Sequence, residues 1–205
     1  MAQKITAADP SDIQPALDCL VDAFSEDPIT GFLLGSGHDG PVRLAQFFSL
    51  LMRARVALRM PVLVARGGDG MLGAAMGYTT ARPAWPAAIE DEWNHFESSV
   101  PGLVDRMALY DEIAQRCKPP MPHYYLGVIG VEPTRRGTGV GTRLLEAFCE
   151  LSALDPLSGG VYLETANPSN VAFYGKAGFE VVGQGRLGIA NLWCLFQAHG
   201  RRRGA

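Results

Sequence analysis

The 205-residue chain has few of the residues from which metal sites and disulfide frameworks are built. Its four cysteines, Cys19, Cys117, Cys149 and Cys194, are scattered, and none forms a C-x-x-C pair. Its four histidines are scattered as well. The sequence therefore indicates neither a metal site nor a disulfide framework.

The chain also lacks a surplus of positive charge and a long apolar run. Lysine and arginine total 18 against 21 acidic residues, giving a net charge of -3, which disfavours a nucleic-acid partner. No apolar run reaches the roughly 18 residues of a membrane span, and the N-terminus has no apolar signal core. We therefore expect no membrane partner and a cytoplasmic location.

What is present fits one folded domain. The hydrophobic share of 47% excludes a disordered chain, and about 150 residues per domain predicts a single domain over residues 1–205 with insertions. Prolines bound an acid-rich, helical stretch at about residues 81–122, which we interpret as an insertion. Residues 200–205 are expected to form a flexible basic tail.

The spacing of apolar residues predicts alternating helices and strands. Asn167, followed by Pro168, is a typical helix start, and Gly178 is a typical helix end. In chain order the predicted elements are a helix at 13–24, a loop at 26–40, a helix at 42–59, a hairpin at 62–80, a strand at 123–131, a helix from 140, a strand at 161–165, a helix at 167–178 and two final antiparallel strands.

The most informative segment is a glycine-rich turn, RRGTGVGT, at residues 135–142. It lies between a predicted strand and a predicted helix, where free N–H groups and the helix dipole favour an anion. Two arginines add charge and forked donors. The segment lacks the lysine of a P-loop, and Thr142 stands where a dinucleotide fingerprint has its third glycine. A pyrophosphate is the expected anion, and a solvated turn is the alternative.

Two patterns in this half resemble the GNAT acyltransferase superfamily. Arg136-x-x-Gly139-x-Gly141 matches its Q/R-x-x-G-x-G/A signature, and residues 167–179 resemble its second signature, N-x-x-A-x-A-x-x-Y-x-x-x-G-F. The resemblance covers residues 123–197 and is greatest to puromycin N-acetyltransferase-like members. It implies an α/β (α+β) GNAT fold, whose central mixed, mostly antiparallel, twisted sheet has a splayed parallel strand pair and flanking helices.

The same resemblance implies acetyl-coenzyme A (acetyl-CoA) as co-substrate and no metal. Backbone N–H groups of the glycine loop would hold the pyrophosphate, and the preceding strand would pair with the pantetheine arm. Glycines at 127 and 130 suit a bulge, a close ligand approach or plain packing. The expected cofactor-binding residues are Ile129, Gly130, Val131, Arg135, Arg136, Gly137, Thr138, Gly139, Val140, Gly141, Thr142, Asn167, Asn170 and Tyr174.

For catalysis, Tyr174 stands where the family has its general acid; packing, or binding the thiol by a hydrogen bond alone, is the alternative. Some members carry a base on the strand before the loop, but Tyr125 and Gly127 occupy those positions here. Glu164 on the next strand is the best substitute, because a carboxylate on an apolar strand is costly unless it is paired or partly protonated. A structural, hydrogen-bonded acid is the alternative, and His123 is a weaker candidate.

The predicted function is transfer of an acetyl group from acetyl-CoA to a primary amine of a small molecule, directly in a ternary complex. One alternative is a protein N-terminal or lysine acetyltransferase; another is a non-catalytic acyl-CoA-binding module, and a third is a dinucleotide oxidoreductase. The acid-rich stretch, with Trp85, Trp93, Phe96 and Tyr110, is expected to contact the amine or to form a solvated face over core aromatics. The protein is expected to be a monomer or a homodimer.

Overall fold

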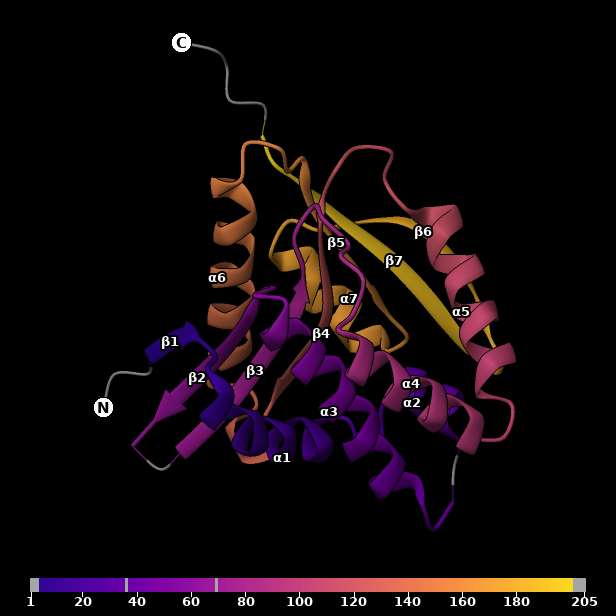
Figure 1. Cartoon of the computed structure of the whole chain (residues 1–205). Helices are drawn as coiled ribbons and strands as arrows, with labels where there is room; N and C mark the ends of the chain where they lie inside the picture. The colour runs from indigo at the N-terminus through magenta and orange to yellow at the C-terminus, as the bar shows by residue number, and fades with distance from the viewer. Residues whose placement is uncertain (1–3, 36, 69, 201–205) are drawn as a thin grey trace.

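The computed structural model describes residues 4–35, 37–68 and 70–200. Within them, seven strands form one sheet in the order β1-β2-β3-β4-β5-β7-β6 (Figure 1). The predicted basic tail at 201–205 lies outside the described residues. The strands are β1 (Lys4–Ala7), β2 (Val62–Gly67), β3 (Gly70–Tyr78), β4 (Tyr124–Val131), β5 (Gly160–Thr165), β6 (Glu180–Leu187) and β7 (Ala190–Ala198).

Only β4 and β5 are parallel; the other neighbouring strands of the described sheet are antiparallel. The parallel pairing is short, joining Tyr124 to Val161 and Tyr125 to Tyr162. Beyond this point β4 pairs only with β3 and β5 only with β7, so β4 and β5 separate toward their carboxyl ends. The mixed, mostly antiparallel sheet with a splayed parallel pair is confirmed.

Helices cover both faces of the sheet (Figure 1). α1 and α3 pack on β2, β3 and β4, and α5 packs on β6 and β7, whereas α6 packs against β2, β3, β4 and β5 from the opposite face. The helices are α1 (Ile13–Ala23), α2 (Pro28–Leu34), α3 (Gly40–Ala57), α4 (Ala87–Ser99), α5 (Leu103–Cys117), α6 (Val140–Leu154) and α7 (Pro168–Lys176).

The prediction of a loop over residues 26–40 is wrong for α2. The Asp27 side chain accepts a hydrogen bond of 2.9 Å from the Thr30 N–H, and Pro28 occupies the first helical turn. Leu33 and Leu34 are buried at its end. A cap, a proline and two core contacts therefore hold a short helix that the glycines of this segment obscure in the sequence.

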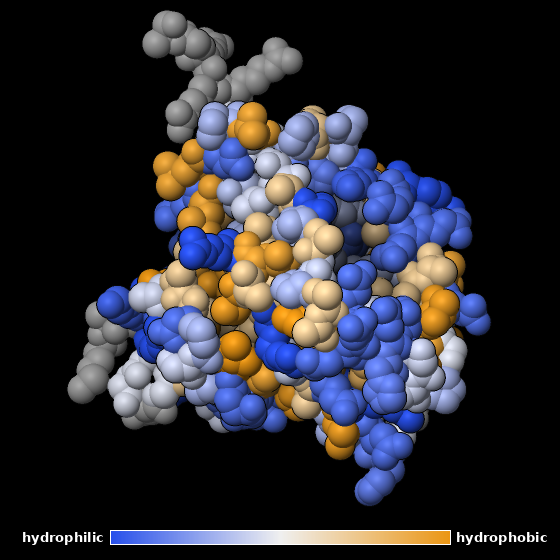
Figure 2. Space-filling view, in the orientation of Figure 1, coloured by the Kyte–Doolittle hydropathy of each residue, from blue (hydrophilic) through white to orange (hydrophobic). Residues whose placement is uncertain are grey.

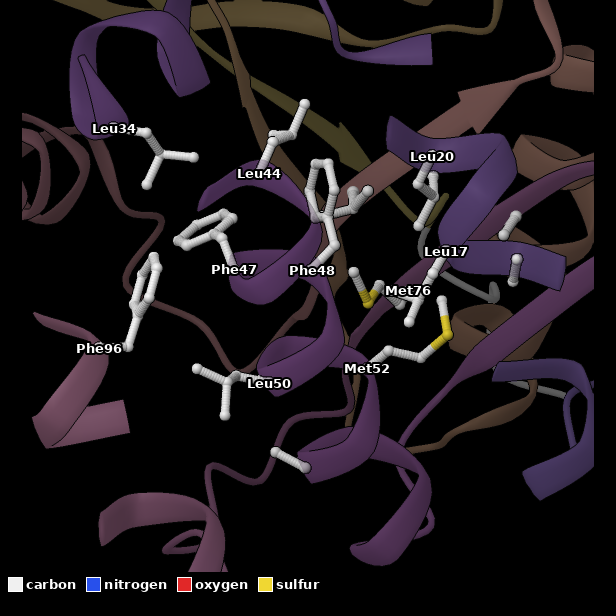
Figure 3. Packing of buried hydrophobic residues seen from close by; sticks show 14 of the residues in the cluster. Leu17, Leu20, Leu34, Leu44, Phe47, Phe48, Leu50, Met52, Met76 and Phe96 are labelled. Carbon is white, nitrogen blue, oxygen red and sulfur yellow. The ribbon is translucent and has the colours of Figure 1, made fainter. Parts of the chain in front are cut away.

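The larger core cluster lies between α1, α3, α4 and the sheet (Figure 3). Phe48 packs edge-on against Phe24 at 5.0 Å between ring centroids, and Phe47 stacks toward Trp93 and Phe96. Of the aromatic residues predicted in the acid-rich stretch, Phe96 thus belongs to the core, at 4% exposure. These ring contacts hold α4 against α3 and thereby fix the position of α4 beside the gap between β4 and β5.

A second core cluster on the opposite face requires a glycine in β3. A Cβ at Gly77 would lie 1.9 Å from the Tyr125 carbonyl oxygen and 2.6 Å from the Phe148 ring. Gly77→Ala is therefore expected to lower the free energy of unfolding by about 3 kcal/mol or more, because backbone and core must shift. Gly175→Ala is the control, since nothing lies within 4 Å of its Cβ in α7 and alanine favours a helix.

Thermal denaturation of both variants tests this account of β3. The Gly77 variant is expected to melt about 10 °C or more below the wild type, and the Gly175 variant at or above it. A Gly77 variant with the wild-type melting temperature would show that the β3–β4 bulge adapts to a side chain.

The surface seen in Figure 2 is mostly polar, with apolar atoms at the upper left over α6. Leu151 and Leu154 of α6 are 38% and 75% exposed. In the part of the chain that the structure describes, no helix is long and apolar enough to cross a membrane.

Candidate active site

Two cavities meet where β4 and β5 separate. The loop cavity, about 580 Å³, is lined by the glycine loop, by β4 and by the start of α7. The aromatic cavity, about 600 Å³, is lined by side chains of α2 to α5 and by β4 and β5. Both volumes are in the range of small-molecule sites. The cavities share the lining residues Phe24, Asp27, Ile129, Asn170 and Tyr174.

The glycine loop has the backbone that an anion cradle needs. Gly137 and Gly139 have φ values of 77° and 86°, which disfavour any side chain, and a Cβ at either would point into open space. α6 begins at Val140, so the N–H groups of its first turn have no acceptor within the helix. The loop can therefore hold a phosphate by its backbone.

Two of the predicted backbone donors are already engaged in turns. The Arg136 N–H donates to the Pro133 carbonyl at 3.3 Å, and the Thr138 N–H donates to the Arg135 carbonyl at 3.3 Å. The Arg136 side chain also donates to the Ala23 carbonyl at 3.0 Å, which ties the loop to the end of α1. The remaining N–H donors are those of Gly137 and of residues 139–142.

β4 presents a backbone edge to the loop cavity. The Glu132 N–H donates to the Leu72 carbonyl of β3 at 2.9 Å. Hydrogen-bonding directions alternate along an antiparallel strand, so Gly130 faces β3, and the N–H and C=O groups of Ile129 and Val131 face the gap left by β5. These groups can pair with an extended ligand.

Glycine stands at two positions of β4, 127 and 130, for different structural reasons. Gly127 is the extra residue of a bulge, because Met76 pairs with Val128 while Gly77 pairs with Leu126. Gly130 is required by packing, since a Cβ there would lie 2.7 Å from the Leu20 side chain in α1. The expected bulge is present at 127, and Gly130 follows the packing alternative.

Asn167 caps α7 by accepting a hydrogen bond of 3.0 Å from the Ser169 N–H. The Asn170 side chain donates to the Thr165 hydroxyl at 3.4 Å. Asn167 lines the loop cavity, and Asn170 lines both cavities. The capping role is thus observed, and it also places the amide groups at the cavity wall.

Tyr174 lies at the junction of the cavities. Its ring packs between Phe173 and Phe179, at centroid distances of 5.1 and 5.7 Å, and the residue is 5% exposed. Burial and the nearby Asp27 carboxylate raise the pKa of the Tyr174 hydroxyl above its usual value. The group therefore stays protonated at neutral pH and can donate a proton.

Glu164 lies at the end of β5 and lines the aromatic cavity. The Tyr110 hydroxyl donates to Glu164 Oε2 at 3.0 Å and lies 3.2 Å from the Tyr125 hydroxyl. Burial raises the pKa of Glu164 to about 7, although hydrogen bonds from Tyr125 and Tyr110 oppose the shift. A carboxyl group with this pKa can accept a proton near neutral pH.

Removing the Tyr110 hydroxyl is expected to raise the pKa of Glu164 further. A donor to a carboxylate favours the ionised form, so its loss disfavours that form. In Tyr110→Phe, any activity that needs ionised Glu164 is expected to begin about one pH unit higher than in the wild type. A pH–rate profile measures this; an unshifted profile would mean that Glu164 does not control the rate.

Most of the predicted cofactor-binding residues line the loop cavity, and both predicted catalytic residues line the aromatic cavity. Val140 is instead buried in the core at 1% exposure, and Thr138 lies outside the lining. His123 lies away from both cavities: its Nδ1 is 2.7 Å from the Met121 carbonyl, and burial lowers its pKa.

Sequence reasoning missed three residues of the aromatic cavity. Asp27 lies between the cavities, Arg55 of α3 lines the aromatic one, and Tyr125 carries a hydroxyl into the Glu164 network. Asp27 and Arg55 stand in no recognisable motif, and only the burial of a charged residue within an apolar helix pattern could have signalled Arg55. Tyr125 stands where some GNAT members carry a base, but this position did not predict its link to Tyr110 and Glu164. Trp85, Trp93 and Tyr110 line this cavity, as the acid-rich stretch suggested.

Comparison with known proteins agrees with this geometry. Residues 104–181 match the family model described as the acetyltransferase (GNAT) domain. This segment of the chain is therefore similar to a GNAT acetyltransferase domain. The matched segment begins in α5 and contains β4, the glycine loop, Glu164 and Tyr174.

Curated relatives share part of their length with this chain. The N-alpha-acetyltransferase RimI of Mycobacterium tuberculosis is 31% identical over 106 residues, covering 48% of this chain and 63% of the relative. An uncharacterized protein of Mycobacterium leprae is 35% identical over 104 residues, covering 48% of this chain and 28% of that protein. The chain therefore spans less than two thirds of each.

Solved structures share the GNAT fold over the whole chain. A structure described as histone acetyltransferase HPA2 and related acetyltransferase, from Corynebacterium glutamicum, has a TM-score of 0.75 at 23% identity, covering 100% of both chains. The PaiA N-acetyltransferase of Thermoplasma acidophilum, solved in complex with coenzyme A, has a TM-score of 0.60 at 12% identity over 97% of this chain and 100% of that one.

Proposed function

We propose that this chain is an N-acetyltransferase that moves the acetyl group of acetyl-CoA to a primary amine of a small molecule, directly in a ternary complex. The observation that carries the proposal is the meeting of two cavities at Tyr174, one built by the glycine loop and the other containing Glu164. A donor and an acceptor bound in separate cavities can react only where these meet.

The loop cavity fits the proposed donor. The open space beside Gly137 and Gly139 lets a phosphate approach the backbone, and the first turn of α6 supplies N–H donors. The free edge of Ile129 and Val131 suits the amides of a pantetheine arm. The thioester of this co-substrate supplies the activated acetyl group. The coenzyme A bound in the PaiA structure, which shares the fold, supports this choice of donor.

The residues of this chain supply the proton transfers. Glu164, with a pKa of about 7, takes a proton from the attacking amine while the new C–N bond forms. Tyr174 gives its proton to the sulfur as the C–S bond breaks, so no charge accumulates on the leaving thiolate. A backbone N–H on the free edge of β4 stabilises the developing oxyanion.

The cysteines also support direct transfer. Burial raises the pKa of Cys149 to about 12, and the same cause raises that of Cys194 to about 12. Neither residue lines a cavity. Cys19 and Cys117 lie outside both cavity linings as well. Since a nucleophilic cysteine needs a lowered pKa and access, this favours direct transfer over an acyl-cysteine route.

A small amine fits the aromatic cavity better than a protein chain does. The cavity is walled by Trp85, Trp93 and Tyr78 and carries acidic side chains that attract an ammonium group. Its volume matches a small molecule. The RimI relative supports a protein N-terminus as the second candidate acceptor.

The test is thiol release on mixing the chain with acetyl-CoA and a panel of acceptors. The panel contains small primary amines, peptides with a free N-terminus and peptides with lysine as the sole amine. We expect release that depends on small amines. Release with peptides alone would favour the second candidate, and binding of acetyl-CoA with no release would support a non-catalytic module.

A further inference from the structure

Arg55 is a buried cation without an acidic partner. It is 4% exposed, and no ion pair joins it to a carboxylate among the described residues. Its Nη1 donates to the Leu51 carbonyl at 2.9 Å, while its Nε is buried without an acceptor. A buried charge is costly unless it is paired and hydrogen-bonded. The unmet donors therefore point to a partner from outside the chain.

The guanidinium is held at the wall of the aromatic cavity. Its Cζ lies 4.6 Å from the centroid of the Tyr78 ring, which offsets part of the cost of burial. Its Nη2 lies over the bulge of β4, 3.4 Å from where a Cβ of Gly127 would be, and has no protein acceptor in the described part of the chain. This edge of the group is available to a ligand in the cavity.

Arg55 and Glu164 act on the same part of the cavity. Burial and the Glu164 carboxylate raise the pKa of the Tyr125 hydroxyl, and the Arg55 guanidinium opposes them. A cation that accepts a carboxylate and an acid that accepts an ammonium proton thus lie around one tyrosine. The contacts agree: Arg55 Nη2 and the Tyr125 ring both lie beside Gly127, at 3.4 and 3.0 Å from where its Cβ would be, and the Tyr110 hydroxyl joins that of Tyr125 to Glu164.

We propose that the acceptor carries a carboxylate beside its primary amine, and that Arg55 binds this carboxylate. The proposal rests on the proposed function and names its substrate class: an amino acid, or a similar amino carboxylate, with an aromatic or apolar side chain. The guanidinium binds the carboxylate by charge-assisted hydrogen bonds. Trp85, Trp93 and Phe47 supply the apolar walls for the side chain.

Two acceptors that differ by a carboxylate test the proposal: phenylalanine and 2-phenylethylamine. We expect the wild type to have at least about tenfold higher kcat/KM for phenylalanine. In Arg55→Gln this preference is expected to fall to about twofold or less. The kcat/KM for phenylalanine is expected to fall, while that for 2-phenylethylamine stays unchanged. Arg53→Gln is the matched control, because Arg53 lies on the same helix but pairs on the surface with Glu92 at 2.6 Å, and it is expected to keep the preference.

A binding measurement keeps the test independent of activity and of the fold of the variants. We expect 3-phenylpropionate to quench the fluorescence of wild-type protein at about tenfold lower concentration than 3-phenylpropanol, because Trp85 and Trp93 line the cavity. Arg55→Met is expected to abolish this difference while melting no lower than the wild type, since no acid loses its partner.

Failure of this proposal differs from failure of the proposed function. Acetylation of 2-phenylethylamine and phenylalanine with equal kcat/KM, together with equal binding of the two phenylpropyl probes, would overturn the role of Arg55 and leave the acetyltransferase intact. Arg55-dependent binding of 3-phenylpropionate without acetylation of any amine would support the carboxylate site and contradict the proposed function.

Discussion

Glu164→Gln is expected to lower kcat/KM for the amine by at least about 100-fold near pH 8, the size of a lost general base. Glutamine keeps the shape of the side chain and can still accept the hydrogen bond from Tyr110. It cannot take a proton from the amine. Loss of activity with an intact fold would therefore separate proton transfer from packing.

The general-base role also predicts how kcat/KM changes with pH. The pKa of Glu164 is about 7, so the wild-type carboxyl group is protonated below this pH and cannot act as a base. Below pH 7, protonation of Glu164 is expected to add about a tenfold fall in kcat/KM for each pH unit to the fall caused by protonation of the amine itself. In Glu164→Gln this acidic limb is expected to vanish, while the limb due to the amine itself remains.

Glu180→Gln is the control for this pair of measurements, because Glu180 is an exposed acid on β6 outside both cavities. It is expected to keep the wild-type rate and profile. A Glu164→Gln variant with an unchanged pH profile would remove Glu164 as the base and leave it as a structural, hydrogen-bonded acid.

Tyr174→Phe is expected to lower kcat at least tenfold with the affinity for acetyl-CoA little changed. The phenylalanine ring preserves the contacts with Phe173 and Phe179, so the fold and the cavity walls remain. What is lost is the hydroxyl proton that the proposed mechanism transfers to the sulfur. Steady-state kinetics and direct binding of acetyl-CoA measure the two effects separately.

Tyr124→Phe is the matched control, since Tyr124 is a buried tyrosine of β4 that lines neither cavity. We expect it to turn over at nearly the wild-type rate. A wild-type kcat in Tyr174→Phe would sink the acid role, and a large loss of affinity instead would assign Tyr174 to binding.

The features that could be predicted from the sequence are those determined by residues that lie close together in the chain. The glycines at 137 and 139 indicate positive φ values, which both residues have, and Asn167 with Pro168 indicates the start of α7. The order of elements around these signals was enough for the GNAT fold and for the splayed pair. Most of the loop cavity follows, because most of its lining lies between Ile129 and Tyr174, and only the part from Ala23 to Asp27 comes from a distant segment.

The aromatic cavity could not be predicted in this way, because its contacts join distant segments. Tyr110 reaches Glu164 across 54 positions, and Arg55 reaches the bulge at Gly127 from another helix. α2 was missed for a related reason: Leu33 and Leu34 stabilise it only through packing with other elements. Such pairings depend on tertiary structure and leave no periodic signal.

The most direct test of two cavities meeting at one reaction centre is an initial-rate study of thiol release in which acetyl-CoA and the amine are both varied. A ternary complex with direct transfer predicts release that requires the amine and double-reciprocal lines that intersect. Parallel lines, or thiol release at the same rate without an amine, would contradict it.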